Sequence, residues 1–159
     1  MNLEDAFFHL FRSRILWSVV LAWFLTQALK VLVTSSKEKK LRMHRIIEPG
    51  GMPSSHAAMV IALLTGVGVK EGVSSTLFIV TLIFSLTIIY EAIGVRKEVE
   101  EQAEILNKIM KNLSKEKTGT SSLNLKMHKS LRETLGHSPL EVLVGGVIGF
   151  LIAVFLWVI

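Results

Sequence analysis

Four apolar runs separated by polar segments set the pattern of the chain. Three of them, Ile15–Val33, Val73–Gly94 and Val142–Ile159, are close to the roughly 20 apolar residues that a membrane-spanning helix needs. The fourth, His56–Val69, has 14 residues and would cover about 21 Å of a hydrocarbon core about 30 Å thick. It either spans a thinned bilayer or is re-entrant. The pattern predicts an all-α integral membrane helical bundle with about four transmembrane helices, one of them short.

Two further segments have an amphipathic pattern. Apolar residues recur at alternating steps of four and three over Val99–Leu113, with charged residues between them, which predicts an amphipathic helix in the long loop. Ser114–Ser122 follows with the composition of a flexible linker. The first residues mix phenylalanine and leucine with charged side chains but lack the basic start and cleavage site of a signal peptide. They predict a short helix lying on the membrane surface.

Composition supports a membrane protein and excludes some chemistry. Hydrophobic residues make up 50% of the chain, and the mean hydropathy of +0.51 is high for a soluble domain. The chain has no cysteine, which excludes disulfides, thiolate catalysis and cysteine-ligated zinc. Neither a repeat nor a domain boundary is visible. We expect one membrane domain over residues 1–159, with a long loop over residues 95–137 inside it.

The positive charges predict an orientation. If all four runs span, the loops Thr34–Ser55 and Arg96–His137 share one side of the membrane and both termini lie on the other. These loops hold most of the 18 lysine and arginine residues, and basic loops stay in the cytoplasm. We expect a multi-pass protein of the inner (plasma) membrane. The net charge of +5 accompanies no nucleic-acid motif, so phospholipid is favoured over nucleic acid as a partner.

The first candidate site is the polar segment Gly50-Gly51-Met52-Pro53-Ser54-Ser55-His56. A serine that follows a proline and precedes an apolar run is typical of a helix N-cap, and the free N–H groups of such a helix start bind anions. Two glycines upstream allow the backbone to approach a ligand closely. The alternative is an ordinary capped helix at the membrane interface.

The second candidate site, Leu135-Gly-His-Ser-Pro-Leu-Glu141, repeats this arrangement before the last apolar run. Ser138 and Glu141 form a capping-box pattern, with Pro139 at the first helical position. His56 and His137 therefore each precede or begin a membrane helix on the same side. One imidazole can attack phosphorus while the other protonates the leaving oxygen. Glu141 can hold the attacking ring in one tautomer, although the capping box alone also accounts for this glutamate.

Two cations are candidates for binding phosphate. Lys30 lies within an apolar run, where an ionisable residue is costly and indicates function. It is also close enough to the predicted helix end for its ammonium group to reach the interface. Arg96 follows the third span and is either a phosphate ligand or a topology anchor. Glu91, one turn inside, can pair with a cation.

These residues resemble the type 2 phosphatidic acid phosphatase superfamily. More closely, the chain resembles its divergent bacterial and plant branch, described as acid phosphatase/vanadium-dependent haloperoxidase related. The motifs that carry the resemblance are Gln27-x-x-Lys30, Gly50-Gly-Met-Pro-Ser-Ser-His56-Ala, Tyr90-Glu-Ala-Ile-Gly-Val-Arg96, Gln102-Ala103 with Leu106-Asn107, and Leu135-Gly-His-Ser-Pro-Leu-Glu141-Val.

The resemblance implies a role for each candidate. His137 would be the nucleophile that forms a phosphohistidine, Glu141 its orienting carboxylate, and His56 the acid for the leaving group. Phosphate binding would involve Lys30, Ser54, Ser55 and Arg96, with support from Gly50, Gly51, Tyr90 and Glu91. Superfamily members need no metal, and we expect neither a metal nor another cofactor.

The chain also departs from the superfamily pattern. No lysine is followed by Arg-Pro at the superfamily spacing, and Ser55 replaces the glycine of Pro-Ser-Gly-His. Glu141 replaces an aspartate, and Arg132 is one position too near His137. Glu91 stands where the branch usually has aspartate.

The leading hypothesis is a phosphatase that removes a phosphate monoester from a lipid at the cytoplasmic leaflet, with phosphatidylglycerophosphate as the first candidate substrate and phosphatidic acid as another. A non-catalytic membrane adaptor that binds anionic lipid or a protein partner is the alternative. A vanadate-dependent peroxidase is a third. Gly145 and Gly149 have the small-x-x-x-small spacing that permits close helix contact within or between chains, so a homodimer is a candidate assembly.

Overall fold

The computed structural model describes residues 2–38, 50–116, 131 and 136–159 of the chain. Within these ranges it contains six helices and no strand. The helices are α1 (Leu3–Phe11), α2 (Arg14–Glu38), α3 (Ser55–Glu71), α4 (Thr76–Ile93), α5 (Val95–Glu116) and α6 (Pro139–Val158). The predicted all-α membrane bundle is confirmed.

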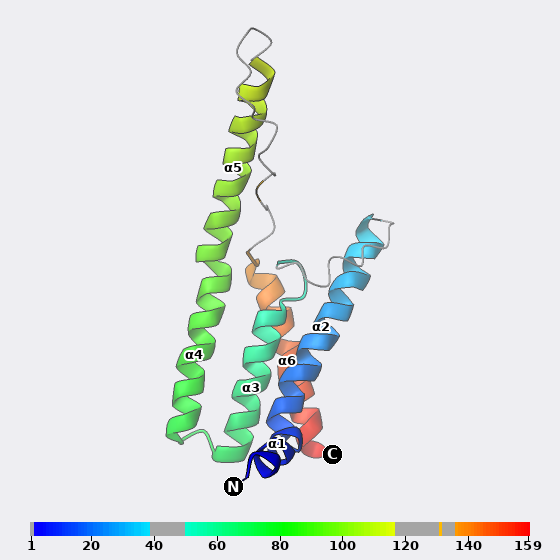
Figure 1. Cartoon of the computed structure of the whole chain (residues 1–159), viewed down its shortest axis with the longest axis vertical. Helices are drawn as coiled ribbons and strands as arrows, with labels where there is room; N and C mark the ends of the chain where they lie inside the picture. Colours follow the sequence, from blue (N-terminus) through cyan, green and yellow to red (C-terminus); the bar gives the residue numbers. More distant parts are fainter. Residues whose placement is uncertain (1, 39–49, 117–130, 132–135) are drawn as a thin grey trace.

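Helices α2, α3, α4 and α6 form a bundle in which α2 and α4 run one way and α3 and α6 run the other (Figure 1). Both chain termini and the turn between α3 and α4 lie at one end of the bundle, which we call the terminal end. The starts of α3 and α6 lie at the opposite end, which we call the loop end. The two candidate sites therefore meet at the loop end.

Three helical stretches are long and apolar enough to cross a membrane: Arg14–Ser36, Thr76–Asn112 and Pro139–Val158. Helix α3 has 17 residues, which correspond to about 26 Å at 1.5 Å per residue. It is one continuous helix that packs against α2, α4 and α6, and its last turns reach the terminal end, where Gly68 lies against Phe78. The short run is therefore a helix through the centre of the bundle and not a re-entrant segment.

The core of the bundle is built from small side chains. Ala22, Ala58, Ala62 and Ala153 are fully buried and form one cluster. Large apolar side chains such as Phe24, Ile83 and Phe155 are mostly exposed, as expected for side chains that face lipid. Small residues let membrane helices approach one another closely, so that van der Waals contacts between backbones hold the bundle together.

Contact between α3 and α6 depends on two glycines. A side chain at Gly145 would collide with the backbone carbonyl of Ser54, and one at Gly149 would collide with that of Ala58. The pairing of 54 with 145 and of 58 with 149 shows that α3 and α6 are parallel. The small-x-x-x-small spacing is thus used within the chain, and it gives no support to the predicted homodimer.

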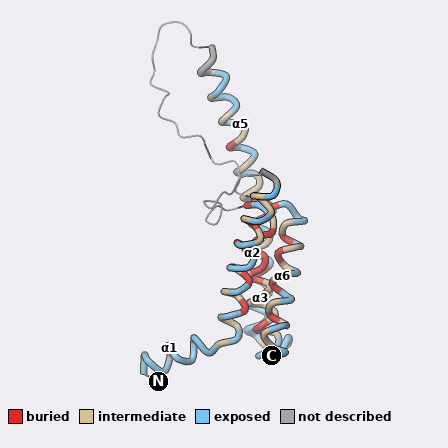
Figure 2. Tube along the Cα trace, turned by 90° about the vertical axis from the view of Figure 1, so that its right-hand side faces the viewer, coloured by how far each residue is buried: buried red, intermediate tan, exposed pale blue. Residues whose placement is uncertain are grey.

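Two helices extend away from the bundle. Helix α5 begins two residues after α4 ends and projects beyond the loop end (Figure 1). It is longer than the predicted Val99–Leu113 and includes Ser114–Glu116, so the prediction of a linker was wrong for these three residues. The rest of that linker, residues 117–122, lies outside the described residues, as does Arg132. Helix α1 leaves the terminal end at a steep angle to the bundle (Figure 2), with Phe7, Phe8, Leu10 and Phe11 exposed.

Candidate active site

The start of α3 is fixed by Ser54, which is fully buried. Its Oγ accepts a hydrogen bond from the backbone N–H of Ala57 at 3.3 Å and caps the helix. Its own N–H donates to the backbone carbonyl of Glu141 at 3.0 Å, which ties the start of α3 to the first turn of α6. Ser55 is the first helical residue and is also buried. Each of the two predicted serines therefore has a place in the first turn of α3.

The glycines that precede this turn have φ angles of 80° at Gly50 and 82° at Gly51. Such positive values favour glycine, because other residues are strained there. A side chain at Gly51 would lie 3.8 Å from the Cγ and Cδ atoms of Lys30. The turn therefore lies against the Lys30 side chain, which comes from α2.

The segment before α6 is held by contacts with α4 and α5. The backbone N–H of His137 donates to the carbonyl of Ala92 at 3.0 Å, and that of Gly136 donates to Glu100 Oε2 at 2.9 Å. Gly136 also packs against the Lys97 backbone, where an added side chain would come within 2.6 Å of Lys97 Cα. The backbone around His137 is therefore fixed on two sides.

The predicted capping box is present at the start of α6. Glu141 N–H donates to Ser138 Oγ at 3.4 Å, and Ser138 N–H donates to Glu141 Oε2 at 3.1 Å. The same carboxylate oxygen lies 3.2 Å from His137 Nδ1. The two roles considered for Glu141, a helix cap and a partner of the imidazole, are therefore both realised by one side chain.

His56 and His137 face each other across the loop end. Their ring centroids are 5.7 Å apart and the ring planes are inclined by 66°. His137 is 1% exposed. If Nδ1 donates to Glu141, Nε2 carries the lone pair, and Nε2 is buried without a hydrogen-bond partner among the described residues. The Nδ1 atom of His56 is likewise buried and unpaired within the described part of the chain.

The positive charges of Lys30 and Arg96, the two predicted cations, act on the histidine pair. Burial lowers the pKa of His137 below its ordinary value, because a buried imidazolium is poorly solvated. The hydrogen bond and the negative charge of Glu141 oppose this shift, while the positive charges of Lys30 and Arg96 add to it. His137 is therefore expected to be neutral at pH 7, with two cations close enough to affect its charge.

The two cations differ in their surroundings. Lys30 is only 3% exposed, so its ammonium group does not reach out of the bundle. Arg96 Nε donates to Glu91 Oε1 at 3.1 Å, and both side chains are partly exposed. Tyr90 is 76% exposed and is not brought to the histidine pair.

Glu100 was not predicted to be part of this site. Its carboxylate accepts from Gly136 N–H and also pairs with Lys97 Nζ at 2.7 Å. Asn107, seven residues further along α5, makes a similar contact. Its side-chain amide donates to the carbonyl of Leu131 and accepts from the Leu131 N–H. In the sequence, Glu100 looks like an ordinary polar-face residue of an amphipathic helix, and no local pattern indicates a partner 36 positions away.

Glu100→Ala is expected to loosen the backbone around His137. The Gly136 N–H would lose its acceptor, and a hydrogen bond of this kind contributes about 1 kcal/mol, so we expect roughly fivefold faster exchange of this amide. Hydrogen exchange followed by mass spectrometry of a peptide containing residues 136–138 measures this effect. Glu104→Ala is the matched control, because Glu104 pairs with Lys108 at 3.6 Å on the exposed surface of α5. Equal exchange rates in the two variants would contradict a role for Glu100.

Across the described residues, no three His, Asp or Glu side chains gather closely enough to hold a metal ion. The polar groups that do converge at the loop end are two imidazoles, one carboxylate bonded to an imidazole, and two cations from separate helices. Residues 11–152, which contain all of these groups, match the sequence profile of the divergent PAP2 family.

The chain belongs to the divergent PAP2 family. It is 37% identical over 145 residues to the uncharacterized membrane protein YuiD of Bacillus subtilis (strain 168), an alignment that covers 89% of this chain and 92% of YuiD. No solved structure matches the chain. The three long apolar helices and the similarity to a membrane protein support a multi-pass membrane protein.

Proposed function

We propose that this protein is a membrane phosphatase that hydrolyses a lipid phosphate monoester through a phosphohistidine intermediate. The observation that carries the proposal is the histidine pair, in which Glu141 holds Nδ1 of His137, Nε2 has no partner among the described residues, and the centroid of the His56 ring lies 5.7 Å from that of His137. A neutral imidazole nitrogen with a free lone pair is a nucleophile, and a second imidazole nearby is suited to proton transfer.

In the first step, His137 Nε2 forms a bond to phosphorus as the bond between phosphorus and the lipid oxygen breaks. The leaving oxygen takes a proton from His56, so the alcohol leaves uncharged. In the second step, a water oxygen attacks phosphorus, gives its proton to His56, and the bond between nitrogen and phosphorus breaks. Phosphate leaves and both histidines return to their starting states.

The groups around the pair are suited to stabilising the charge of the transferring phosphoryl group. Lys30 and Arg96 supply positive charge, and the parallel helices α3 and α6 begin on the same side of the bundle. Helix starts carry partial positive charge and free N–H groups, and preorganised donors of this kind stabilise a transition state strongly. The position of Lys30 supports this role, since its buried side chain lies beside the turn at Gly51 that precedes α3.

The membrane side on which the loop end is expected to lie indicates which lipids can reach the histidine pair. The basic loops support a cytoplasmic loop end, where phospholipid precursors such as phosphatidylglycerophosphate are made. We therefore infer that phosphatidylglycerophosphate is the substrate to test first and phosphatidic acid the second.

The test is phosphate release from each of these lipids by the purified protein in detergent with EDTA present. We expect release by the wild type that survives EDTA and is lost in His137→Ala and in His56→Ala, both checked for helicity and monodispersity. Release that requires added metal would overturn the mechanism. A well-folded wild type that releases phosphate from neither lipid would favour the adaptor.

The pH dependence follows from the lowered pKa of His137. The nucleophile must be neutral, so the acidic limb of the pH–rate profile, where His137 becomes protonated, should lie below the ordinary histidine pKa of about 6.5. Glu141 raises this pKa, so Glu141→Gln should lower both the maximal rate and the pH at which the acidic limb falls. The pH–rate profiles of both proteins, recorded at constant ionic strength, test this. An acidic limb that moves to higher pH in Glu141→Gln would contradict the assignment.

A further inference from the structure

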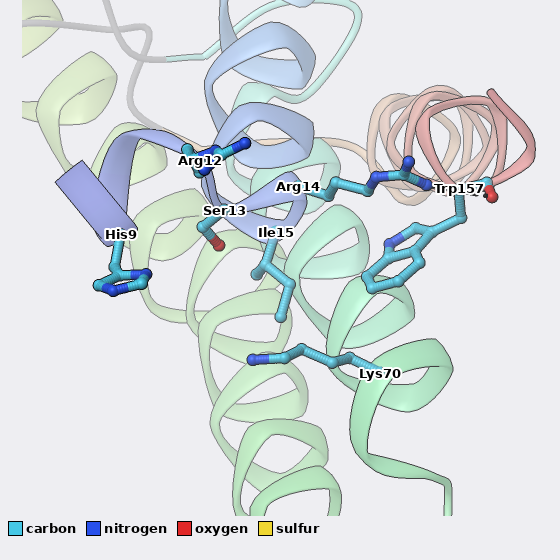
Figure 3. A pocket seen from close by; sticks show the side chains of 7 residues that line it. All are labelled: His9, Arg12, Ser13, Arg14, Ile15, Lys70 and Trp157. Carbon is cyan, nitrogen blue, oxygen red and sulfur yellow. Dashed lines mark hydrogen bonds between the residues drawn. The ribbon is translucent and has the colours of Figure 1, made fainter.

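A second polar site lies at the terminal end of the bundle, away from the histidine pair. It is a pocket of about 380 Å³ where the joint between α1 and α2 meets the last turns of α3 and α6 (Figure 3). His9, Arg12, Ser13, Arg14, Lys70 and Trp157 line it around the side chain of Ile15. The pocket thus combines residues from the two ends of the described chain and from its middle.

The lining of this pocket is basic. It includes two arginines, a lysine and a histidine, and within the described residues no acidic side chain lines it. Lys70 pairs with Glu71 at 3.4 Å, outside the lining, and both side chains remain well exposed. The described lining therefore offers an anion three permanent positive charges and no carboxylate.

Aromatic rings hold the two arginines without using up their donors. The guanidinium of Arg14 lies 5.7 Å from the centroid of the Trp157 ring, and that of Arg12 lies 5.1 Å from that of Phe8. Stacking on an aromatic face leaves the N–H groups at the edge of the guanidinium available for a bidentate acceptor. Arg14 also makes a long contact of 3.5 Å with the Trp157 carbonyl, which leaves most of its five N–H groups for a ligand.

A further donor in the pocket lacks a partner. Trp157 Nε1 is buried and has no hydrogen-bond partner among the described residues. A buried N–H without an acceptor is costly, so an acceptor oxygen in the pocket would remove this cost. Ser13, which also lines the pocket, caps the start of α2 by accepting from the N–H of Leu16 at 3.3 Å. Arg14 and Ile15, the first residues of α2, line the pocket, and the start of a helix carries partial positive charge.

The position of α1 places this pocket at the depth of lipid headgroups. Helix α1 leaves the bundle steeply, and its phenylalanines are exposed (Figure 2). An amphipathic helix of this kind lies in the membrane interface with its apolar side chains in the acyl boundary. Since only Arg12 and Ser13 separate α1 from α2, which begins the first membrane span, the joint that forms the pocket lies at the same level.

We propose that this terminal-end pocket binds the phosphate group of an anionic phospholipid in the leaflet opposite the histidine pair. The arginines and Lys70 hold the phosphate oxygens, Trp157 donates its N–H, and the acyl chains extend along the exposed apolar surface of the bundle. The site is separate from the proposed phosphatase site and has no histidine pair to carry out hydrolysis.

Native mass spectrometry of the full chain in a neutral detergent tests the proposal. Phosphatidylglycerol and phosphatidylcholine are added in equal amounts, and retained lipid is counted. Arg12→Gln/Lys70→Gln removes two charges from the pocket, and Lys108→Gln/Lys111→Gln removes the same charge from exposed positions on α5. We expect retention of phosphatidylglycerol by the wild type and by the α5 variant, and about tenfold weaker retention by the pocket variant.

Two more variants distinguish binding in this pocket from a general effect of charge and from binding at the loop end. Trp157→Phe keeps every charge but removes the indole N–H, and should also weaken retention of phosphatidylglycerol. His137→Ala should not, because the histidine pair is at the other end of the bundle. If the double pocket variant does not fold, retention of phosphatidylglycerol is compared in the single variants Trp157→Phe and Lys70→Gln instead.

Three outcomes would overturn the proposal. Equal retention of phosphatidylglycerol and phosphatidylcholine would show that the pocket does not select an anionic headgroup. Equal losses in the pocket and α5 variants would indicate general surface charge. Displacement of the lipid by inorganic phosphate, but not by chloride at the same ionic strength, would indicate a site for soluble phosphate.

Discussion

Gly149→Ala and Gly145→Ala should each destabilise the bundle strongly, whereas Gly146→Ala should leave it nearly unchanged. An added methyl group at 149 or 145 collides with the backbone carbonyl of Ala58 or Ser54. Because backbone cannot move aside as a side chain can, α3 and α6 must separate, and overpacking of this kind costs about 1–3 kcal/mol or more. At Gly146 the new atom would lie 3.5 Å from Ile61 Cγ1, an ordinary contact.

The measurement is loss of helicity as dodecyl sulfate replaces a mild detergent, followed by circular dichroism. The three variants make the same chemical change on the same helix, so differences among them report the contact with α3. The tight contact between α3 and α6 would be refuted if all three variants denatured at the same dodecyl sulfate fraction. Gly145→Ala should also reduce phosphate release, since Ser54 lies two residues before His56.

His56→Ala should slow the first step far more on a lipid phosphate than on an aryl phosphate. An alkoxide is a poor leaving group and needs the proton of His56, whereas a nitrophenolate leaves without one. General acid catalysis contributes about 10²- to 10⁴-fold in rate, and we expect the loss on phosphatidylglycerophosphate to fall in this range. With p-nitrophenyl phosphate, the first step should survive.

The aryl substrate should also allow the phosphohistidine intermediate to be observed directly in His56→Ala. Without His56 to accept the proton of the attacking water, His56→Ala should release nitrophenol in a burst and accumulate phosphate on His137. The adduct should be labile to acid and stable to alkali, as a phosphohistidine is, and should be absent from His56→Ala/His137→Ala. Equal losses in the rate of the first step on both substrates would argue that His56 binds phosphate and does not donate a proton.

The elements of the fold were predictable because their signals are local. Apolar length indicated the long spans, and the steps of four and three indicated α5. Ser54, Ser138, Pro139 and Glu141 marked helix starts through hydrogen bonds within one turn. The convergence of His56 and His137 at one end also followed from the topology, since both precede or begin helices on the same side.

The rest could not be predicted because it depends on contacts between distant segments. Glu100 and Ala92 hold the backbone before α6 through single hydrogen bonds that leave no periodic pattern. The role of Gly145 and Gly149 remained ambiguous, because the same spacing fits contact within a chain or between chains. Tyr90 shares a motif with Arg96, yet its position on the helix directs it outward, where it is 76% exposed.

The small-residue core changes which substitutions this bundle can tolerate. In most water-soluble domains the interior accepts large apolar residues and the surface accepts polar ones. Here the fully buried positions have no space for a larger side chain, among them Ser18, Ala22, Thr26 and Ala62. Exposed positions such as Phe24 and Ile83 face lipid and can take any apolar side chain. A scan of single substitutions should therefore find the tightest size limits at the smallest residues.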